Sequence, residues 1–389
     1  DMKRFLLFLI VTCFLITVGI QGISAQTGEA KTPERSDFIF IPDVYLWGGE
    51  VNLGFRHLSF VEGLDTVFWL RLGAQYGTEY FYRNPDGSLY YDVTDGWLSV
   101  YPPDSAPAYS RLNTVWGLGL EQGILWNDRL NENLLASFLY YFGRFDKHFP
   151  DQEKNQLIFD SLLPDAEGIL QHSFMLGFYL DDVKLDKINK TKNGIYLETS
   201  AQWGPRFLGN DFFGEADFIR FNVTGEYYLP ILDAAPESKM NIFSLYLADF
   251  FAADFVTGSS IPINVRKSIG GLSRGLGLGG AVRGFGPGRF DANLKLVNNV
   301  ELRANLPAIL IRDIVPGVLI YFDSGYYGII EGAAVSSVNN GLLLSTGAGI
   351  YLNVLDFAQF TAYSHIALNR TKVDGAFWTP FAFAFTFHF

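Results

Sequence analysis

One arginine and two carboxylates in the C-terminal third of the chain have the types and spacing to form an ion-pair site. Arg283 closes a glycine-rich run, and Glu301 and Asp323 stand in the next two strand-like segments. A guanidinium is a planar fork that pairs bidentately with carboxylates, so this set favours an electrostatic clasp over a catalytic centre. Gly284 permits a positive φ or a close backbone approach, and Phe285 offers an apolar wedge. We predict that Arg283 lies at the tip of a loop folded back against a wall that carries both carboxylates.

Other motifs in the chain do not combine into a catalytic or cofactor site. The run Gly275–Gly280 matches the dinucleotide-binding fingerprint, but that motif needs a following helix, and no helical period follows. Ser364 and His365 would suit a membrane phospholipase, yet no matching catalytic partners accompany them. The five histidines lack ligand spacing, and the single cysteine, Cys13, lies in a segment that we expect to be removed. We predict that the protein is not an enzyme and has no cofactor and no metal site.

The two segments that carry the carboxylates alternate with the period of a β-strand. Glu301 falls on the polar face of 294–306, and Asp323 falls on the face of 316–328 that lies opposite an apolar row. Neighbouring strands lie about 4.8 Å apart, so both carboxylates can flank one guanidinium. The polar face holds Lys295, Val297, Asn299, Glu301 and Arg303, and the apolar row holds Val318, Ile320 and Phe322.

The C-terminal strand decides between a soluble β-protein and a membrane barrel. In 379–389 phenylalanine takes every second position from 381 to the last residue, and the positions between are small or polar. A chain that ends on an aromatic strand terminating in Phe is typical of bacterial outer-membrane barrels, whose assembly machinery reads the last strand. We predict an all-β fold, an antiparallel transmembrane β-barrel, with Phe385, Phe387 and Phe389 as its C-terminal assembly signal.

Composition agrees with this fold class. Aromatic residues make up 16% of the chain, as expected where side chains face lipid and form interfacial girdles. After the N-terminal segment, no apolar run reaches the roughly 18 residues of a membrane helix. The formal net charge of −12 argues against nucleic acid as a partner. We predict outer-membrane lipid as a partner and the outer membrane of a bacterial cell as the location.

The N-terminal part has the order of a secretory signal peptide, which we assign to residues 1–25. A basic start is followed by an apolar run and by small residues at the cleavage site. Residues 26–37 are polar and are predicted to be a short disordered leader. Residues 38–389 are predicted to be the barrel, and 257–293 its inward-folded, glycine-rich plug loop.

Alternation and turn residues mark fourteen strand-like segments. Bacterial barrels usually have an even number of strands. We therefore expect fourteen to sixteen strands, with twelve as the lower limit. If the last strand descends to the periplasm, 257–293 connects two strands on the outside. The segments are 38–47, 49–59, 64–78, 111–126, 132–144, 170–184, 193–205, 216–229, 240–256, 294–306, 316–328, 341–352, 356–367 and 379–389.

Three motifs together resemble the outer-membrane-protein-assembly superfamily of BamA, TamA and the two-partner-secretion transporters, the bacterial surface antigen type. In that superfamily an external loop places an Arg-Gly-aromatic tip against wall strands that carry a Glu and an F-x-D-x-G aspartate. The resemblance covers about residues 270–389. It implies a loop-lock motif made of Arg283, Gly284, Phe285, Glu301, Asp323 and Gly325.

The resemblance also implies a protein-handling barrel that assists insertion or translocation of proteins at the outer membrane. A weak seam between the first and last strands would open and template an incoming strand by β-augmentation. Members usually carry periplasmic polypeptide-transport-associated domains. None fits before residue 38, so client outer-membrane proteins would need separate periplasmic factors. Two alternatives stay open: a passive or gated pore or structural barrel without insertase activity, and a surface adhesin that uses the long loops 80–110 and 145–169.

Overall fold

The computed structural model describes most of the predicted barrel region. The predicted signal peptide and leader, 1–25 and 26–37, lie outside the described residues. Within the described part of the chain, no helix combines the length and hydropathy needed to cross a membrane. The described residues are 38–45, 48–58, 60–80, 108–128, 130, 132–150, 165, 167–186, 190–234, 243–272, 281–285, 292–309, 314–328, 341–354, 358–369 and 378–387.

Fourteen described strands follow one another in a single antiparallel sheet, each paired with the next one along the chain. Each of the fourteen overlaps one of the segments predicted from the sequence. A further short strand, β7 (Lys184–Asp186), was not predicted and pairs only with β8. The strands of the main path are β1 (Phe38–Tyr45), β2 (Gly48–Phe55), β3 (Thr66–Tyr80), β4 (Ala108–Asn127), β5 (Glu132–Pro150), β6 (Gly168–Asp181), β8 (Thr191–Gly204), β9 (Asp217–Ala234), β10 (Phe243–Ser260), β11 (Leu294–Asn305), β12 (Ile314–Gly328), β13 (Gly341–Val354), β14 (Ala358–Ala367) and β15 (Trp378–Phe387).

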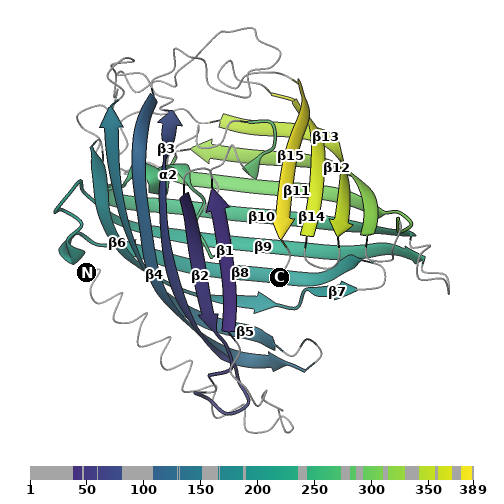
Figure 1. The fold of residues 1–389 in the computed structure, drawn as a ribbon, viewed down its shortest axis with the longest axis horizontal. Helices are drawn as coiled ribbons and strands as arrows, with labels where there is room; N and C mark the ends of the chain where they lie inside the picture. The colour runs from purple at the N-terminus through teal and green to yellow at the C-terminus, as the bar shows by residue number, and fades with distance from the viewer. Residues whose placement is uncertain are drawn as a thin grey trace.

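The sheet curls until its two edge strands, β1 and β15, face each other across the front of the view in Figure 1. Between the described residues of β1 and β15 there is no strand pairing, so the sheet is an open curl here. Closure into a barrel with an even number of strands therefore stays a prediction. Pro42 lies in β1, paired with Val51 of β2. Proline has no N–H for a ladder and is confined to strand edges, which agrees with the edge position of β1.

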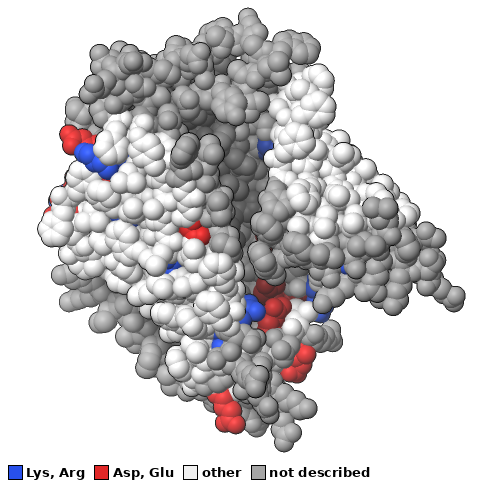
Figure 2. Space-filling model, viewed as in Figure 1, with Lys and Arg blue, Asp and Glu red and all other residues white. Residues whose placement is uncertain are grey.

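Exposed apolar side chains alternate with buried ones along the strands, as a membrane barrel requires. In β12, Val318, Ile320 and Phe322 are 43%, 58% and 44% exposed, whereas Asp323 is fully buried. In β11, Leu296 is exposed and Lys295 is fully buried. In the view of Figure 2, few charged side chains appear on the outer surface of the described strands. The two faces predicted for 294–306 and 316–328 are therefore present in the structure.

Several strands continue further than their sequence pattern indicated. β5 ends at Pro150 rather than 144, β9 at Ala234 rather than 229, and β10 at Ser260 rather than 256. The extensions stay paired with a neighbour, for example Asp146 of β5 with Asn113 of β4. Ladder pairing thus extends strands beyond the apolar alternation that marks the membrane-facing part. The connection predicted at 257–293 accordingly begins after Ser260.

The segment that follows β10 packs against the inner side of the curl and contains a five-residue helix, α2 (Ile263–Lys267), that the sequence pattern did not predict. Ile261 and Val265 are buried in one apolar cluster with Ile169, Phe218 and Val256 from the wall. We call residues 263–272 the loop base and residues 281–285 the loop tip. A second short helix, η1 (Arg206–Leu208), connects β8 and β9.

Candidate functional site

The loop tip is a tight turn whose shape depends on glycine. The N–H of Phe285 donates to the carbonyl oxygen of Val282 at 3.3 Å. Gly284 has a φ of +92°, a conformation that strains any residue with a Cβ atom. A Cβ atom at this position would also lie 3.3 Å from the Cβ atom of His365. Gly284 therefore allows the turn to approach the wall closely enough for Arg283 to reach it.

Asp323 of β12 fixes both the side chain and the backbone of Arg283. Nε of Arg283 donates to Oδ2 of Asp323 at 2.7 Å, and Nη2 donates to Oδ1 at 2.7 Å. The backbone N–H of Arg283 also donates to Oδ2, at 3.0 Å. This is the bidentate fork geometry that a guanidinium offers and an ammonium does not. One carboxylate thus determines where the turn sits.

Glu301 of β11 completes the ion-pair site and links it to a second arginine. Nη1 of Arg283 donates to Oε1 of Glu301, and Nε of Arg303 donates to Oε2 at 2.6 Å. Glu301 and Asp323 come from neighbouring strands, because β11 pairs with β12 in antiparallel register. The site holds two cations and two anions, so each of these largely buried charges has a partner of opposite sign. This balance limits the cost of removing the charges from water.

Two tyrosines cover the guanidinium of Arg283. Its Cζ atom lies 3.6 Å from the ring centroid of Tyr321 and 5.3 Å from that of Tyr363. A cation over an aromatic face is favoured by the ring quadrupole, more so where water is excluded. The hydroxyl of Tyr321 is in turn hydrogen-bonded to Nδ1 of His365. Tyr321, Tyr363 and His365 are not among the predicted lock residues, although Tyr321 stands two residues before Asp323 and therefore shares its inward face.

Apolar side chains on both sides of Arg283 wedge the tip against the wall. Val282 is fully buried, and Phe285 is 5% exposed. Nδ2 of Asn299 donates to the carbonyl oxygen of Ala281 at 2.8 Å, which satisfies a backbone acceptor in this buried place. The apolar cluster around the tip consists of Phe250, Ala252, Ile269, Ala281, Val282, Phe285, Ala292, Val297, Tyr327, Leu343 and Ala367.

The remaining predicted site residues lie in β12, in β15 or outside the described residues. Gly325 lies in β12 and is paired with Val297 of β11 and Leu343 of β13. Phe385 and Phe387 lie in β15, and Phe389 lies outside the described residues. The described residues include no group of histidine, aspartate and glutamate side chains that could hold a metal ion. The arrangement around Arg283 can hold a loop in place.

A chamber of about 1020 Å³ lies between the loop base and the wall, which is formed mainly by β2 to β5. On the loop side it is lined by Asn264, Val265 and residues 267–272. On the wall side it combines charged groups such as Arg71 and Glu121 with aromatic rings and several glycines. Side chains of neighbouring strands fill the space over several of these glycines, for example Tyr140 over Gly119 and Trp116 over Gly143. The chamber is the space that remains between these side chains and the loop base.

Comparison with solved structures finds a similar fold in CdiB and BamA chains. The structure of CdiB from Escherichia coli matches with a TM-score of 0.52 and 13% sequence identity, over 88% of this chain and 53% of that chain. The fold is that of CdiB. BamA from Haemophilus ducreyi lacking POTRA domains 1–3 matches with a TM-score of 0.49 and 11% identity, over 88% of this chain and 62% of that one. CdiB from Acinetobacter baumannii gives 0.47 and 13%, over 88% and 50%.

The likeness is one of fold, and this chain spans between half and about three fifths of the length of these solved chains. Neither a family model nor a curated protein matches the sequence. The match with CdiB agrees with the fold that the resemblance implied. This fold agrees with the outer-membrane location predicted from the C-terminal strand.

Proposed function

We propose that the protein is an outer-membrane barrel of the assembly and translocation type, which assists the insertion or translocation of other proteins. The observation that carries this proposal is the seat of the loop tip. Arg283 belongs to the connection between β10 and β11. Its side chain points inward and pairs with Glu301 and Asp323 on the next two strands. The fold of CdiB, a two-partner-secretion transporter, supports the same conclusion.

The proposed mechanism uses the two edges of the sheet. The fourteen strands of the main path would close into a barrel when β1 pairs with β15. An edge strand presents unpaired N–H and C=O groups, so an opened seam can template an incoming strand by β-augmentation. Client outer-membrane proteins and periplasmic factors are the partners that this mechanism requires. It involves no nucleotide and no covalent step.

Within this mechanism, Arg283, Gly284, Phe285, Glu301, Asp323 and Gly325 form the loop lock, and Phe385, Phe387 and Phe389 form the signal by which the chain is itself assembled. The lock would keep the connection between β10 and β11 inside the barrel while the seam opens and closes. Phe285 and its apolar neighbours would set the depth of the tip, and the ion pairs its position along β11 and β12.

Depletion of the protein in its native host tests the proposal. We expect the abundance of at least one other outer-membrane protein to fall several-fold, measured by quantitative proteomics of outer-membrane fractions. Re-expression of the wild-type chain should restore that abundance, and re-expression of an Asp323→Ala variant should not. An outer-membrane proteome that is unchanged after depletion would contradict the assembly function.

A gated pore is the second candidate function, and the chamber beside the loop base favours it. In this case Arg283→Ala would change single-channel conductance or its gating in planar bilayers, because the loop tip would leave its seat. The abundance of other outer-membrane proteins would not depend on this chain. Conductance that is the same in Arg283→Ala and in wild type would exclude a pore gated by the tip.

A further inference from the structure

A second cluster of buried charges lies on the inner wall beside the loop base. Asp254 of β10 stands at its centre and is 1% exposed. Arg220 of β9 donates to it through Nε, 2.7 Å from Oδ1, and through Nη2, 3.0 Å from Oδ2. Nζ of Lys295 of β11 lies 3.0 Å from Oδ2 of Asp254. Three neighbouring strands thus place two cations around one carboxylate, away from water.

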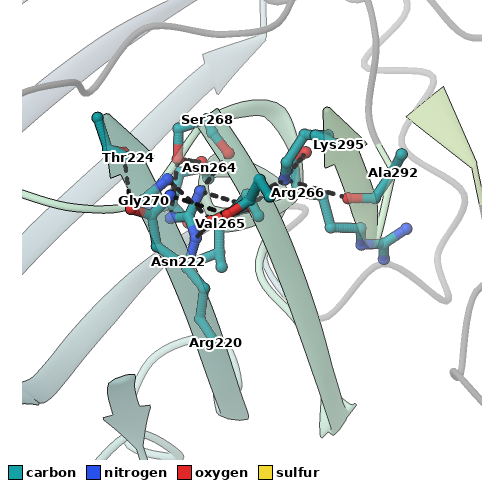
Figure 3. Close-up of polar contacts among 12 residues, drawn as sticks. Arg220, Asn222, Thr224, Asn264, Val265, Arg266, Ser268, Gly270, Ala292 and Lys295 are labelled. Atoms are coloured by element: carbon teal, nitrogen blue, oxygen red, sulfur yellow. Dashed lines mark hydrogen bonds and ion pairs between the residues drawn. The ribbon is translucent and has the colours of Figure 1, made fainter. Parts of the chain in front are cut away.

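Carbonyl oxygens of the loop base and of Ala292 receive the remaining donors of this cluster, as Figure 3 shows. Nζ of Lys295 donates to the carbonyl oxygens of Val265, Arg266 and Ala292 at 3.3, 2.9 and 3.2 Å. The carbonyls of Val265 and Arg266 belong to the last turn of α2, where carbonyl groups lack intrahelical donors. A buried ammonium needs such acceptors, so Lys295 and the helix satisfy each other.

Arg220 and Asp254 hold the residues that follow the helix. Arg220 donates through Nη2 to the carbonyl oxygen of Ser268 and through Nη1 to its Oγ. The backbone N–H of Gly270 donates to Oδ1 of Asp254 at 2.9 Å. The N–H of Leu272 donates to Oε1 of Glu198 at 2.8 Å, which extends the contact to β8. Backbone groups from 265 to 272 are therefore bonded to side chains of the wall.

The loop base and the loop tip use different charged side chains. The base is bonded to Asp254 and Lys295, whereas the tip is bonded to Glu301 and Asp323. An apolar contact joins the two parts, because Ile269 of the base belongs to the same cluster as Phe285 of the tip. Release of the tip would therefore remove apolar packing from the base but none of its hydrogen bonds to the charged side chains of the wall.

We propose that Asp254, with Arg220 and Lys295, is a second anchor that positions the loop base independently of Arg283. The base remains a fixed partition along the chamber when the tip leaves its seat. The charge count supports this role, since the cluster carries two cations and one anion, and the loop carbonyls supply the missing negative partners. The inference concerns loop geometry and needs no client protein, so its failure and the failure of the proposed function are separate results.

Gly270 offers a substitution that disturbs the anchor from the loop side and removes no charge from the wall. A Cβ atom at Gly270 would lie 2.8 Å from Nε of Arg220 and 2.8 Å from Oδ1 of Asp254. Both atoms belong to a buried ion pair that is joined by two hydrogen bonds. We therefore expect the loop to move away, and the wall side chains to keep their positions. Gly77 is the matched control, because a Cβ atom there would meet no atom within 4 Å.

The test uses a cysteine as a reporter and measures how accessible the loop base is to a labelling reagent. Cys13 is the single cysteine of the chain, so Val265→Cys in a Cys13→Ser background gives one reporter at a site that is 2% exposed. The protein is refolded into lipid vesicles, and the labelling rate is measured with a membrane-impermeant maleimide. We expect Gly270→Ala to raise this rate at least tenfold, and Arg283→Ala and Gly77→Ala to leave it within twofold of the parent.

Two results would overturn the second anchor. One is an unchanged labelling rate in Gly270→Ala. The other is an increase in Arg283→Ala as large as that in Gly270→Ala, since the base would then depend on the tip. Heat-modifiable migration on gels checks that each variant is folded. If Gly270→Ala does not fold, Lys295→Met takes its place, because it removes the three bonds to the loop carbonyls and leaves the Arg220–Asp254 pair.

Discussion

At the scale of single residues, the seat of Arg283 is specific for a guanidinium. A lysine has one ammonium group, so it cannot pair bidentately with Asp323, reach Glu301 and stack on Tyr321 at the same time. We predict that Arg283→Lys lowers the free energy of unfolding by about 2–3 kcal/mol, the value of hydrogen bonds to charged groups. Urea denaturation of the protein refolded into lipid vesicles measures this loss.

The control for this substitution is an arginine on the surface. Arg206 pairs with Glu215, but its side chain is 56% exposed, and an exposed ion pair contributes roughly 0–1 kcal/mol. Arg206→Lys should therefore leave the unfolding midpoint nearly unchanged. Equal losses in Arg283→Lys and Arg206→Lys would mean that the tip is not held by its guanidinium.

Asp165, in the connection between β5 and β6, is a second residue with a testable environment. Its Oδ2 accepts the N–H of Ile263 at 2.9 Å, so it holds the first residue of α2. Burial raises the pKa of Asp165 to about 6, from an ordinary value near 3.8, although the bond from Ile263 and the charge of Arg266 oppose the shift. Ionised Asp165 thus costs stability that protonated Asp165 does not.

The sign of the pH dependence follows from this raised pKa. The folded protein takes up a proton at Asp165 as pH falls through 6, whereas the unfolded chain does so only near 3.8. The contribution of Asp165 to stability therefore increases from pH 7 to pH 4, by roughly 3 kcal/mol for a shift of about two units. We predict that the stability difference between wild type and Asp165→Asn changes in favour of wild type over this range. A difference that stays constant with pH would show that Asp165 does not titrate there.

At the scale of elements, the connection between β6 and β8 is bonded to a distant strand. Nδ2 of Asn305 in β11 donates to the carbonyl oxygen of Lys190 and to Oγ of Ser244, at 2.9 Å each. The hydroxyl of Tyr351 donates to Oδ1 of Asn305 at 2.7 Å. A single buried amide therefore joins this connection to β10, β11 and β13.

Replacing this amide tests how firmly the connection is held. Asn305→Leu removes three hydrogen bonds and leaves buried polar partners, so we predict a loss of about 2–4 kcal/mol in the free energy of unfolding. We also expect faster proteolysis near Lys190 in vesicle-reconstituted protein. Asn193→Leu, in an exposed position of β8, is the matched control and should have little effect. No difference between the two variants would contradict the packing of this connection against β11.

The sequence predicts strands better than it predicts what fills the curl. Alternation placed Glu301 and Asp323 on inward faces, because one buried face repeats every second residue. It could not indicate α2, which has five residues and depends on Lys295 and Asp165 from elsewhere in the chain. Pairing partners such as Arg220 with Asp254 lie in different strands, and each looks like a lone charge in the sequence. Register and loop placement bring them together, and neither has a local signal.

At the scale of the whole molecule, the inner and outer faces of one sheet have separate tasks. The outer face carries exposed apolar side chains, such as Ile320 and Phe383, that suit lipid. Among the ion pairs of the described inner face, the clusters around Arg283 and around Asp254 bind the connection between β10 and β11. The chamber lies on the opposite side of that connection. The molecule is thus a curled sheet with an internal partition, and the described residues of its edge strands, β1 and β15, are not paired with each other.

The ion pair between Arg283 and Asp323 holds the loop tip against the inner wall. A double-mutant cycle with Arg283→Ala, Asp323→Ala and the double variant measures this coupling directly, from unfolding free energies in lipid vesicles. We predict a coupling energy of about 2–3 kcal/mol, since the two side chains are buried and joined by two hydrogen bonds between charged groups. Single-variant losses that add within about 0.5 kcal/mol would contradict the account, because the two residues would then not interact in the membrane.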